Sequence, residues 1–182
     1  MKKLLCIFLM TALVSCVGNN QNIVYKPAPQ ILPQHIKSLS VEPFSNKSSI
    51  FGIEQRLTLK IIDEFLKDGQ YKIVNPNEAD GILSGEIKNY LMTPIQYDSN
   101  MVPTVYKITV QYAIKLADKK TNTILWEEKT LVANQIYSAS TLPGGMTEEE
   151  AREKIWDIIS KDVVKRTVKG FGSVTGVSEK KI

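Results

Sequence analysis

The clearest chemistry in the sequence belongs to Cys16, which directly follows Leu13-Val14-Ser15. Two lysines at positions 2 and 3 and an apolar run from Leu4 to Leu13 precede this block. A basic start, a short apolar stretch and a small residue at the cleavage position are typical of an exported protein. The cysteine placed immediately after them indicates a bacterial lipoprotein signal. We predict cleavage before Cys16 and attachment of a diacylglyceryl group to its thiol.

The apolar run 4–13 is too short to cross a bilayer, which takes about 20 apolar residues, so we interpret it as a processing segment. The two or three acyl chains of a bacterial lipoprotein form a stable anchor, since each buried methylene contributes about 0.8 kcal/mol. Val17 is not the acidic residue that retains lipoproteins in the inner membrane, so by this family rule we expect attachment to the outer membrane. The alternative is a plain secretory signal that happens to contain a cysteine.

The rest of the sequence contains no recognisable catalytic constellation. His35 is the single histidine, Cys6 lies in the predicted signal, and Cys16 is the predicted lipid site. A histidine-based triad or a metal cluster cannot be built from one imidazole without a free thiol. We expect His35 to be a solvated linker residue, and Glu78 and Asp80 to be surface carboxylates. The sequence therefore predicts neither an enzyme nor a cofactor or metal site.

The charge balance also restricts the class of protein. From Cys16 onward the chain keeps 167 of its 182 residues, with 21 of the 23 basic and all 19 acidic residues. The resulting net charge of +2 does not favour nucleic-acid binding. The length suits one domain, and without a thiol to pair, that domain must be held together by packing.

Segment boundaries follow from composition. Residues 1–15 are the predicted signal peptide, and residues 16–36, with their run of Asn and Gln and three prolines, are expected to form a lipidated tether. A single α/β domain is expected over 37–171. Residues 172–182 have no hydrophobic period and are expected to form a flexible tail.

Hydrophobic spacing predicts the elements of that domain. A period of two between Val105 and Leu116 is typical of a strand with one buried face. Apolar residues at every fourth position from Ile53 to Phe65 indicate an amphipathic helix over about 50–67. A second helix is expected from Thr147, which forms a possible capping box with Glu150. Further strands are expected at 39–41, 71–74, 81–91 and 124–137.

These elements give the order β-α-β-β-β-β-α and predict an α+β fold. Two amphipathic helices must bury their apolar faces, and a mostly antiparallel sheet of four to five strands offers one apolar face. We therefore expect both helices to pack on one face of that sheet.

Two connections are long and apolar, over 92–104 and 134–146. They contain Tyr97, Met101, Tyr137 and Leu142, and neither contains a lysine or arginine. In a sheet of hairpins both connections fall at the same end. Exposed apolar loops on a rigid scaffold indicate a protein-binding surface, and these four residues are our candidates for contact with a partner. The alternative is that the loops fold back over the sheet edge.

Several blocks, taken in order, resemble the LPS-assembly lipoprotein family, LptE. They are Tyr25, Leu39-Ser40-Val41-Glu42-Pro43-Phe44-Ser45-Asn46, Gly52-Ile53-Glu54, Ala79-Asp80, Leu83-Ser84-Gly85-Glu86-Ile87 with Tyr90, Tyr106-Lys107-Ile108 and Leu125-Trp126. The resemblance implies an α/β domain with two helices on a mostly antiparallel sheet. It also implies an outer-membrane lipoprotein that sits inside the β-barrel LptD, helps it assemble, and supports delivery of lipopolysaccharide to the outer leaflet.

The chain departs from the family in one respect. Some members are thought to contact lipopolysaccharide through basic loop residues, but no Lys or Arg occurs between Asn89 and Tyr106 or between Thr130 and Ala151. No lipopolysaccharide-binding residue is therefore carried over, although the glycolipid stays a possible partner. A second class, lipoprotein activators of periplasmic cell-wall synthases, also stays open. The Ala79-Asp80 pair with the block 83–87 favours LPS assembly over that class.

Overall fold

The computed structural model describes residues 32–170, so the predicted signal peptide, the lipidation of Cys16 and the 172–182 tail lie outside the described residues. The predicted α+β class is confirmed. The elements are β1 (Ser38–Val41), β2 (Ser45–Asn46), α2 (Ile53–Asp68), β3 (Lys72–Ile73), β4 (Gly81–Tyr97), β5 (Pro103–Asp118), β6 (Thr123–Ser138) and α3 (Glu148–Lys169).

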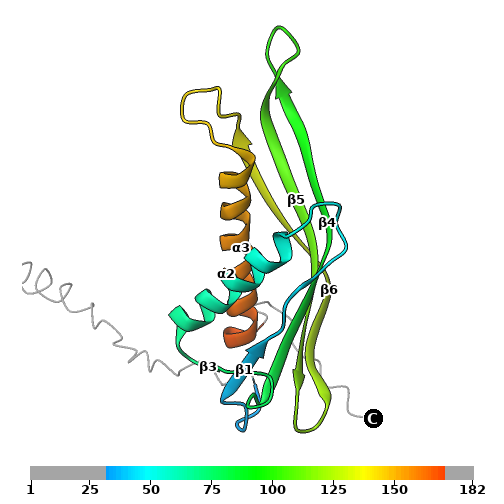
Figure 1. Cartoon of the computed structure of the whole chain (residues 1–182), viewed down its shortest axis with the longest axis vertical. Helices are drawn as coiled ribbons and strands as arrows, with labels where there is room; N and C mark the ends of the chain where they lie inside the picture. Colours follow the sequence, from blue (N-terminus) through cyan, green and yellow to red (C-terminus); the bar gives the residue numbers. More distant parts are fainter. Residues whose placement is uncertain (1–31, 171–182) are drawn as a thin grey trace, which may run out of the picture.

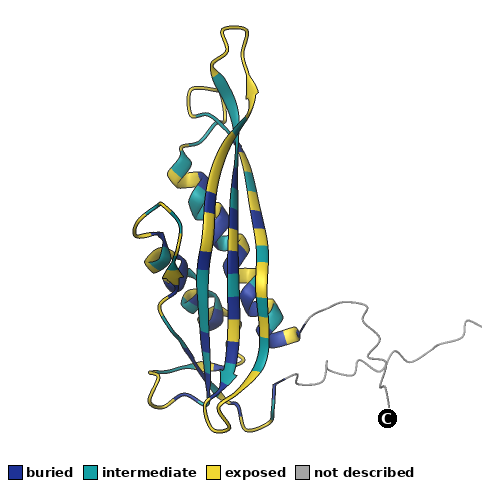
Figure 2. Ribbon diagram, turned by 90° about the vertical axis from the view of Figure 1, so that its right-hand side faces the viewer, coloured by how far each residue is buried: buried dark blue, intermediate teal, exposed yellow. Residues whose placement is uncertain are grey.

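One mixed sheet runs the length of the elongated molecule, with both helices on the same face (Figure 1). Its strand order is β3-β1-β4-β5-β6, and β2 also pairs with β4. The long strands β4, β5 and β6 form an antiparallel meander, whereas the short β1 and β2 lie parallel to β4 and β3 lies parallel to β1. Within residues 32–170, no helix covers the opposite face of the sheet (Figure 2). The sheet has six strands instead of the expected four to five, because the two-residue β2 has no sequence period to detect.

Strand β4 extends well beyond its predicted end, whereas β5 and β6 end close to where they were predicted to end. β4 continues to Tyr97 and β5 begins at Pro103, so the connection predicted over 92–104 is a hairpin with a turn of only five residues, 98–102. β6 reaches Ser138, which leaves 139–147 as the connection to α3. Register shifts between Pro94 and Gln96 and between Gln96 and Tyr97 break the alternation at the end of β4. Such bulges hide a strand from a period-of-two search.

A further irregularity in the middle of β4 changes which side chains lie on the buried face of the sheet. The register shifts between Ile87 and Asn89, so Tyr90 is buried while Leu91 is 53% exposed. In the sequence, Leu91 lies at even spacing from Leu83 and Ile87, which predicts that all three share the buried face, and the structure shows that this is wrong for Leu91. One extra residue in a strand exchanges the faces of everything after it.

Gly85 lies inside β4 and is close-packed. A Cβ atom there would overlap the ring of Phe44, which is almost fully buried. The ring comes from the segment between β1 and β2, and the N–H of Phe44 donates to the hydroxyl of Thr58 on α2 at 3.0 Å. Glycine is required because the ring lies directly on the strand backbone.

The packed domain begins earlier than predicted. Leu32 and Ile36 are buried in the core, and the Nε2 atom of His35 lies 2.7 Å from Oδ2 of the buried Asp118. The end of the expected 16–36 tether is therefore part of the domain: His35 is exposed to solvent, as expected, but it contacts the folded domain through Asp118 instead of lying in a free linker. The contact between His35 and Asp118 joins residues that are 83 apart in sequence, so no local pattern predicts it.

Within the sheet, helix α3 packs mainly against β6 and β5. Its capping box is present: the Thr147 hydroxyl accepts from the N–H of Glu150, and the Glu150 carboxylate accepts from the N–H of Thr147. The buried face includes Ile155, Trp156, Ile159 and Val163. On its other side α3 meets α2 through ion pairs Arg56–Glu153 at 2.6 Å and Lys60–Asp157 at 2.7 Å.

Ile159→Ala should lower the free energy of unfolding by about 2–5 kcal/mol, because Ile159 is completely buried and its loss would leave a cavity. Ile158 is a matched control on the same helix, since its side chain is 45% exposed. Ile158→Ala should change stability by no more than about 0.5 kcal/mol. Urea unfolding followed by circular dichroism measures both. An equal effect of the two variants would show that α3 is packed on a different face.

Asp80 fastens the start of β4 to β1. The N–H groups of Lys37 and Ser38 and the Ser38 hydroxyl all donate to Asp80 Oδ2, at 2.8–2.9 Å. These hydrogen bonds, led by the Lys37 N–H, hold the pKa of Asp80 below its ordinary value. Asp80 was expected to be a surface carboxylate, and the structure makes it a link between two strands.

A carboxyl group with a lowered pKa stabilises the fold only in the pH range in which the group is charged. The contribution of Asp80 should be complete above about pH 4, the unfolded-state value, and should disappear as the pH falls through the lower folded-state value. Asp80→Asn should therefore be less stable than wild type at pH 7, with the difference shrinking in acid. Glu78→Gln changes a nearby exposed carboxylate and should not alter this profile. Chemical unfolding over a pH series measures the effect, and a difference that grows below pH 4 would contradict it.

Candidate partner-binding end

The β4–β5 turn and the β6–α3 connection lie at the same end of the molecule, as the sequence predicted (Figure 1). We call this the distal end and define it as residues 92–105 and 137–147. The N–H of Ala139 donates to the carbonyl of Thr104 at 2.9 Å, so the two segments are joined through their backbones. They form one surface instead of two separate loops.

Apolar side chains are exposed at this end. Of the predicted partner-binding residues, Tyr97, Met101 and Leu142 are all exposed, and Met101 is 75% exposed. The structure adds Ile95 and Val102, which the sequence analysis did not single out. Both sit beside predicted candidates in the same apolar stretch, so that stretch was the available signal.

The distal turn is fixed by Asp98. Its Oδ1 atom accepts from the N–H of Asn100 at 2.8 Å and of Val102 at 2.9 Å, and its own N–H donates to the Val102 carbonyl. Met101 adopts a left-handed backbone conformation with φ of 62°. These bonds hold the exposed apolar side chain of Met101 on an ordered backbone, which lowers the entropy lost on binding.

Tyr137 differs from the other three candidates. It lies on β6, its side chain is buried, and its ring stacks on Tyr106 with 5.5 Å between centroids. Its hydroxyl donates to the sulfur of Met92 at 3.1 Å, and burial raises its pKa. The structure therefore places Tyr137 beneath the exposed surface, where it supports the base of the hairpin.

Two further tyrosines connect the sheet to α3. The hydroxyl of Tyr90 donates to Glu148 Oε1 and that of Tyr112 to Asp162 Oδ2, each at 3.0 Å. Burial, together with the neighbouring carboxylate in each case, raises the pKa of both tyrosines well above the ordinary value. Both hydroxyls stay protonated at physiological pH, so they can continue to donate these bonds.

Phe51 was missed by the sequence analysis and is 95% exposed. It precedes Gly52 in the connection between β2 and α2, beside a hollow of about 510 Å³ that Arg56 and Arg152 also line. Asn46 orders this connection by donating to the Ile50 carbonyl at 2.7 Å and to Glu54 at 2.8 Å. The position of Phe51, outside the apolar face of α2 that repeats at every fourth residue, was the only sequence signal for it.

The distal end is also poor in cations. Neither of the segments that form it, 92–105 and 137–147, contains a lysine or arginine. Within residues 32–170, no group of three or more His, Cys, Asp or Glu side chains is arranged to hold a metal ion. In the same range, no helix is long and apolar enough to cross a membrane. What the distal end offers is neutral apolar contact.

Fold and site together define a class: a two-layer α+β domain whose candidate site is an exposed apolar end instead of an enclosed cavity. The family model described as LptE, lipopolysaccharide-assembly, matches residues 36–167, and the chain belongs to this family. It is thus an outer-membrane lipoprotein of the LptE type, and the family is a non-enzymatic, accessory one.

Solved structures agree with the fold. A protein from Xanthomonas campestris is 13% identical with a TM-score of 0.51, covering 78% of this chain and 88% of that one. A hypothetical protein from Chlamydia trachomatis is 9% identical with a TM-score of 0.49, covering 72% and 95%. A lipoprotein from Neisseria meningitidis is 13% identical with a TM-score of 0.43, covering 70% and 98%. At these identities the Xanthomonas structure supports the fold alone. No curated protein matches the chain.

Proposed function

We propose that this protein is the lipoprotein partner of an LptD-like outer-membrane β-barrel. Its distal end enters the lumen, the domain plugs the barrel and assists its assembly, and the complex supports delivery of lipopolysaccharide to the outer leaflet. The observation that carries this proposal is the rigid, apolar and cation-free distal hairpin, which is exposed on a chain of the LptE family.

The dimensions of the domain support a plug. β4 contains 17 residues, which corresponds to about 55 Å at roughly 3.3 Å per residue. A bilayer with its headgroups is about 40–45 Å thick. The sheet is therefore long enough to pass through a barrel from the periplasmic side and place its distal turn near the opposite rim.

The chemistry of the surface also suits a barrel lumen, which is polar and hydrated. Interfaces of this kind combine a few aromatic or apolar anchors with hydrogen bonds around them. Tyr97, Met101 and Leu142 are the proposed anchors at the distal end, and Phe51 is a further anchor on the side of the domain. We assign no lipopolysaccharide-binding residue, because the distal end lacks cations for its phosphates.

The lipid anchor is the second part of the proposal. Cys16 would carry the acyl chains, and residues 17–31 would connect it to the domain, which begins by Leu32. Fifteen residues reach at most about 50 Å, so the domain stays close to the leaflet that holds the lipid. The runner-up function, activation of a periplasmic cell-wall synthase, would use the same apolar surface on a different partner.

Replacing Cys16 with Ala should abolish acylation and release the protein from outer membranes as a soluble or uncleaved form. Intact-mass spectrometry of the membrane fraction measures the acyl mass directly. A Cys16→Ala protein that still sediments with outer membranes, with wild type carrying no lipid, would show that the signal interpretation is wrong.

Photo-crosslinking amino acids at Tyr97, Met101 and Leu142 should form adducts with a large outer-membrane barrel in cells. Leu66 on α2 is a control, since it is an exposed apolar residue away from the distal end. Met101→Asp should lower the amount of co-purifying barrel at least about tenfold, because a charge would replace an apolar anchor at the centre of the contact. Leu66→Asp should leave it unchanged. Adducts with a cell-wall synthase would instead support the alternative function.

A further inference from the structure

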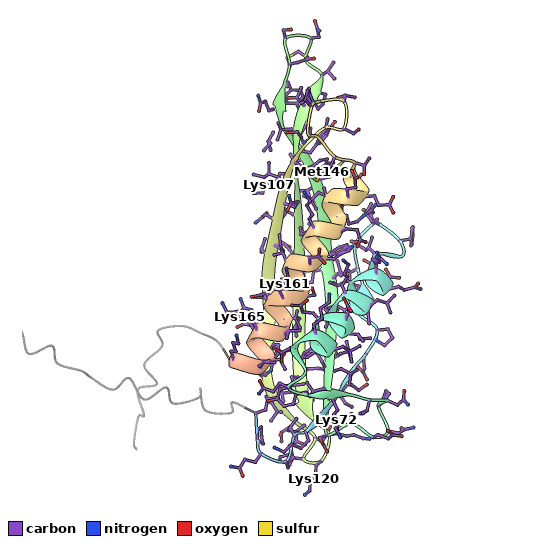
Figure 3. The ribbon with its side chains drawn as sticks, turned by 90° about the vertical axis from the view of Figure 1, so that its left-hand side faces the viewer. Lys72, Lys107, Lys120, Met146, Lys161 and Lys165 are labelled. Carbon is purple, nitrogen blue, oxygen red and sulfur yellow. The ribbon has the colours of Figure 1, made fainter. Side chains whose placement is uncertain are left out.

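Lysines gather on the second half of α3, in the half of the molecule that lies away from the distal hairpin (Figure 3). Lys161, Lys165 and Lys169 are all exposed on the second half of α3, spaced four residues apart. This spacing places them in one row along the helix. Figure 3 shows Lys161 and Lys165 on the outer side of α3, away from the sheet. We call these three residues the basic ridge.

The basic ridge is not used by the fold. Within the described residues none of its lysines forms an ion pair, whereas the neighbouring Arg166 pairs with Asp162 at 2.7 Å. A cation in the last turn of a helix is stabilised by the helix dipole, which accounts for Lys169. The effect falls off within one turn, so it does not account for Lys161, which lies two turns before the helix end.

The position of the basic ridge relative to the chain ends indicates what it faces. The described chain begins and ends at the end of the sheet that lies away from the distal hairpin, close to the last turn of α3 (Figure 1). Leu32 follows Cys16 by 16 residues, so acyl chains on Cys16 would hold a lipid leaflet within about 50 Å of this end. Lys120, at the β5–β6 turn, lies at the same end (Figure 3).

We propose that the basic ridge contacts the anionic phospholipid headgroups of the leaflet that holds the lipid anchor. The proposal rests on the lipid anchoring of Cys16 proposed above. The three lysines extend over about 12 Å of helix, enough for several headgroups. Lysines near an anionic membrane surface each strengthen binding by about fivefold, and such a patch is a common second signal beside acyl chains.

Lysine footprinting on the full mature lipoprotein tests this inference. The protein is reconstituted into phosphatidylcholine vesicles with or without phosphatidylglycerol, and acetylation by a membrane-impermeant reagent is followed by mass spectrometry. Acetylation of Lys161, Lys165 and Lys169 should slow by at least about fivefold when phosphatidylglycerol is present, and the protection should disappear in high salt. Lys47 and Lys88, exposed and outside any ion pair of the described residues, should react equally in both vesicles.

Charge variants distinguish vesicle binding through the basic ridge from general electrostatic attraction between the protein and the vesicle. Replacing all three ridge lysines with Gln should lower vesicle binding of the unacylated protein by about 100-fold, and replacing them with Arg should preserve it. A control triple, Lys47→Gln with Lys88→Gln and Lys107→Gln, removes the same charge and should cost much less. Circular dichroism establishes that each variant is folded. Equal losses in the two Gln triples would overturn the proposal.

Two outcomes keep this inference apart from the proposed function. If mass spectrometry finds no acyl chains, the anchoring proposal fails, and soluble protein added to the same vesicles still reports whether the ridge is protected. If acylated protein shows no protection with phosphatidylglycerol, or is protected only when lipopolysaccharide is supplied, the phospholipid contact is wrong while the barrel proposal stands.

Discussion

Burial of α3 against the antiparallel meander is the interaction on which the rest of the structure depends. The inward faces of β4, β5 and β6 are apolar over much of their length, and such a surface is stable only when it is covered. Helix α3 supplies Ile155, Trp156, Ile159 and Val163 to this face. The hydroxyls of Tyr90 and Tyr112 then fix its position by donating to carboxylates near its start and in its second half.

This arrangement determines what the distal end can do. Because the meander is anchored along α3, the β4–β5 hairpin can extend past the helix without losing its backbone pairing. The Tyr106–Tyr137 stack closes the apolar layer beneath it, and Asp98 orders the turn above. Met101 and Tyr97 are consequently presented on a rigid support. A protein that must fit inside another protein benefits from such order, since less conformational entropy is lost on binding.

The sequence predicted the fold class, both helices and the three long strands, because their hydrophobic periods are regular. It failed where a bulge or a distant contact decides the structure. The register shift after Ile87 exposes Leu91. The bulges near Pro94 concealed the last residues of β4, so the end of the β4–β5 hairpin was predicted to be a loop. His35 was placed in a tether because its partner Asp118 lies 83 residues away.

At the candidate site, too, some residues could be predicted from the sequence and others could not. Tyr97, Met101 and Leu142 could be found because they are apolar residues in segments without lysine or arginine. Tyr137 could not be separated from them, since its burial depends on a stack with Tyr106 on the neighbouring strand, which no local pattern reports. The blocks that carry the family resemblance have structural roles that we can now see: Asp80 joins β1 to β4, and Gly85 admits the ring of Phe44. These residues define the fold and do not by themselves identify the partner.

Native mass spectrometry of the protein purified from detergent-solubilised outer membranes tests the central claim most directly. The account predicts a one-to-one complex of the acylated lipoprotein with a single large β-barrel. A complex with a periplasmic cell-wall synthase, or an acylated protein that is always recovered without a barrel, would contradict it.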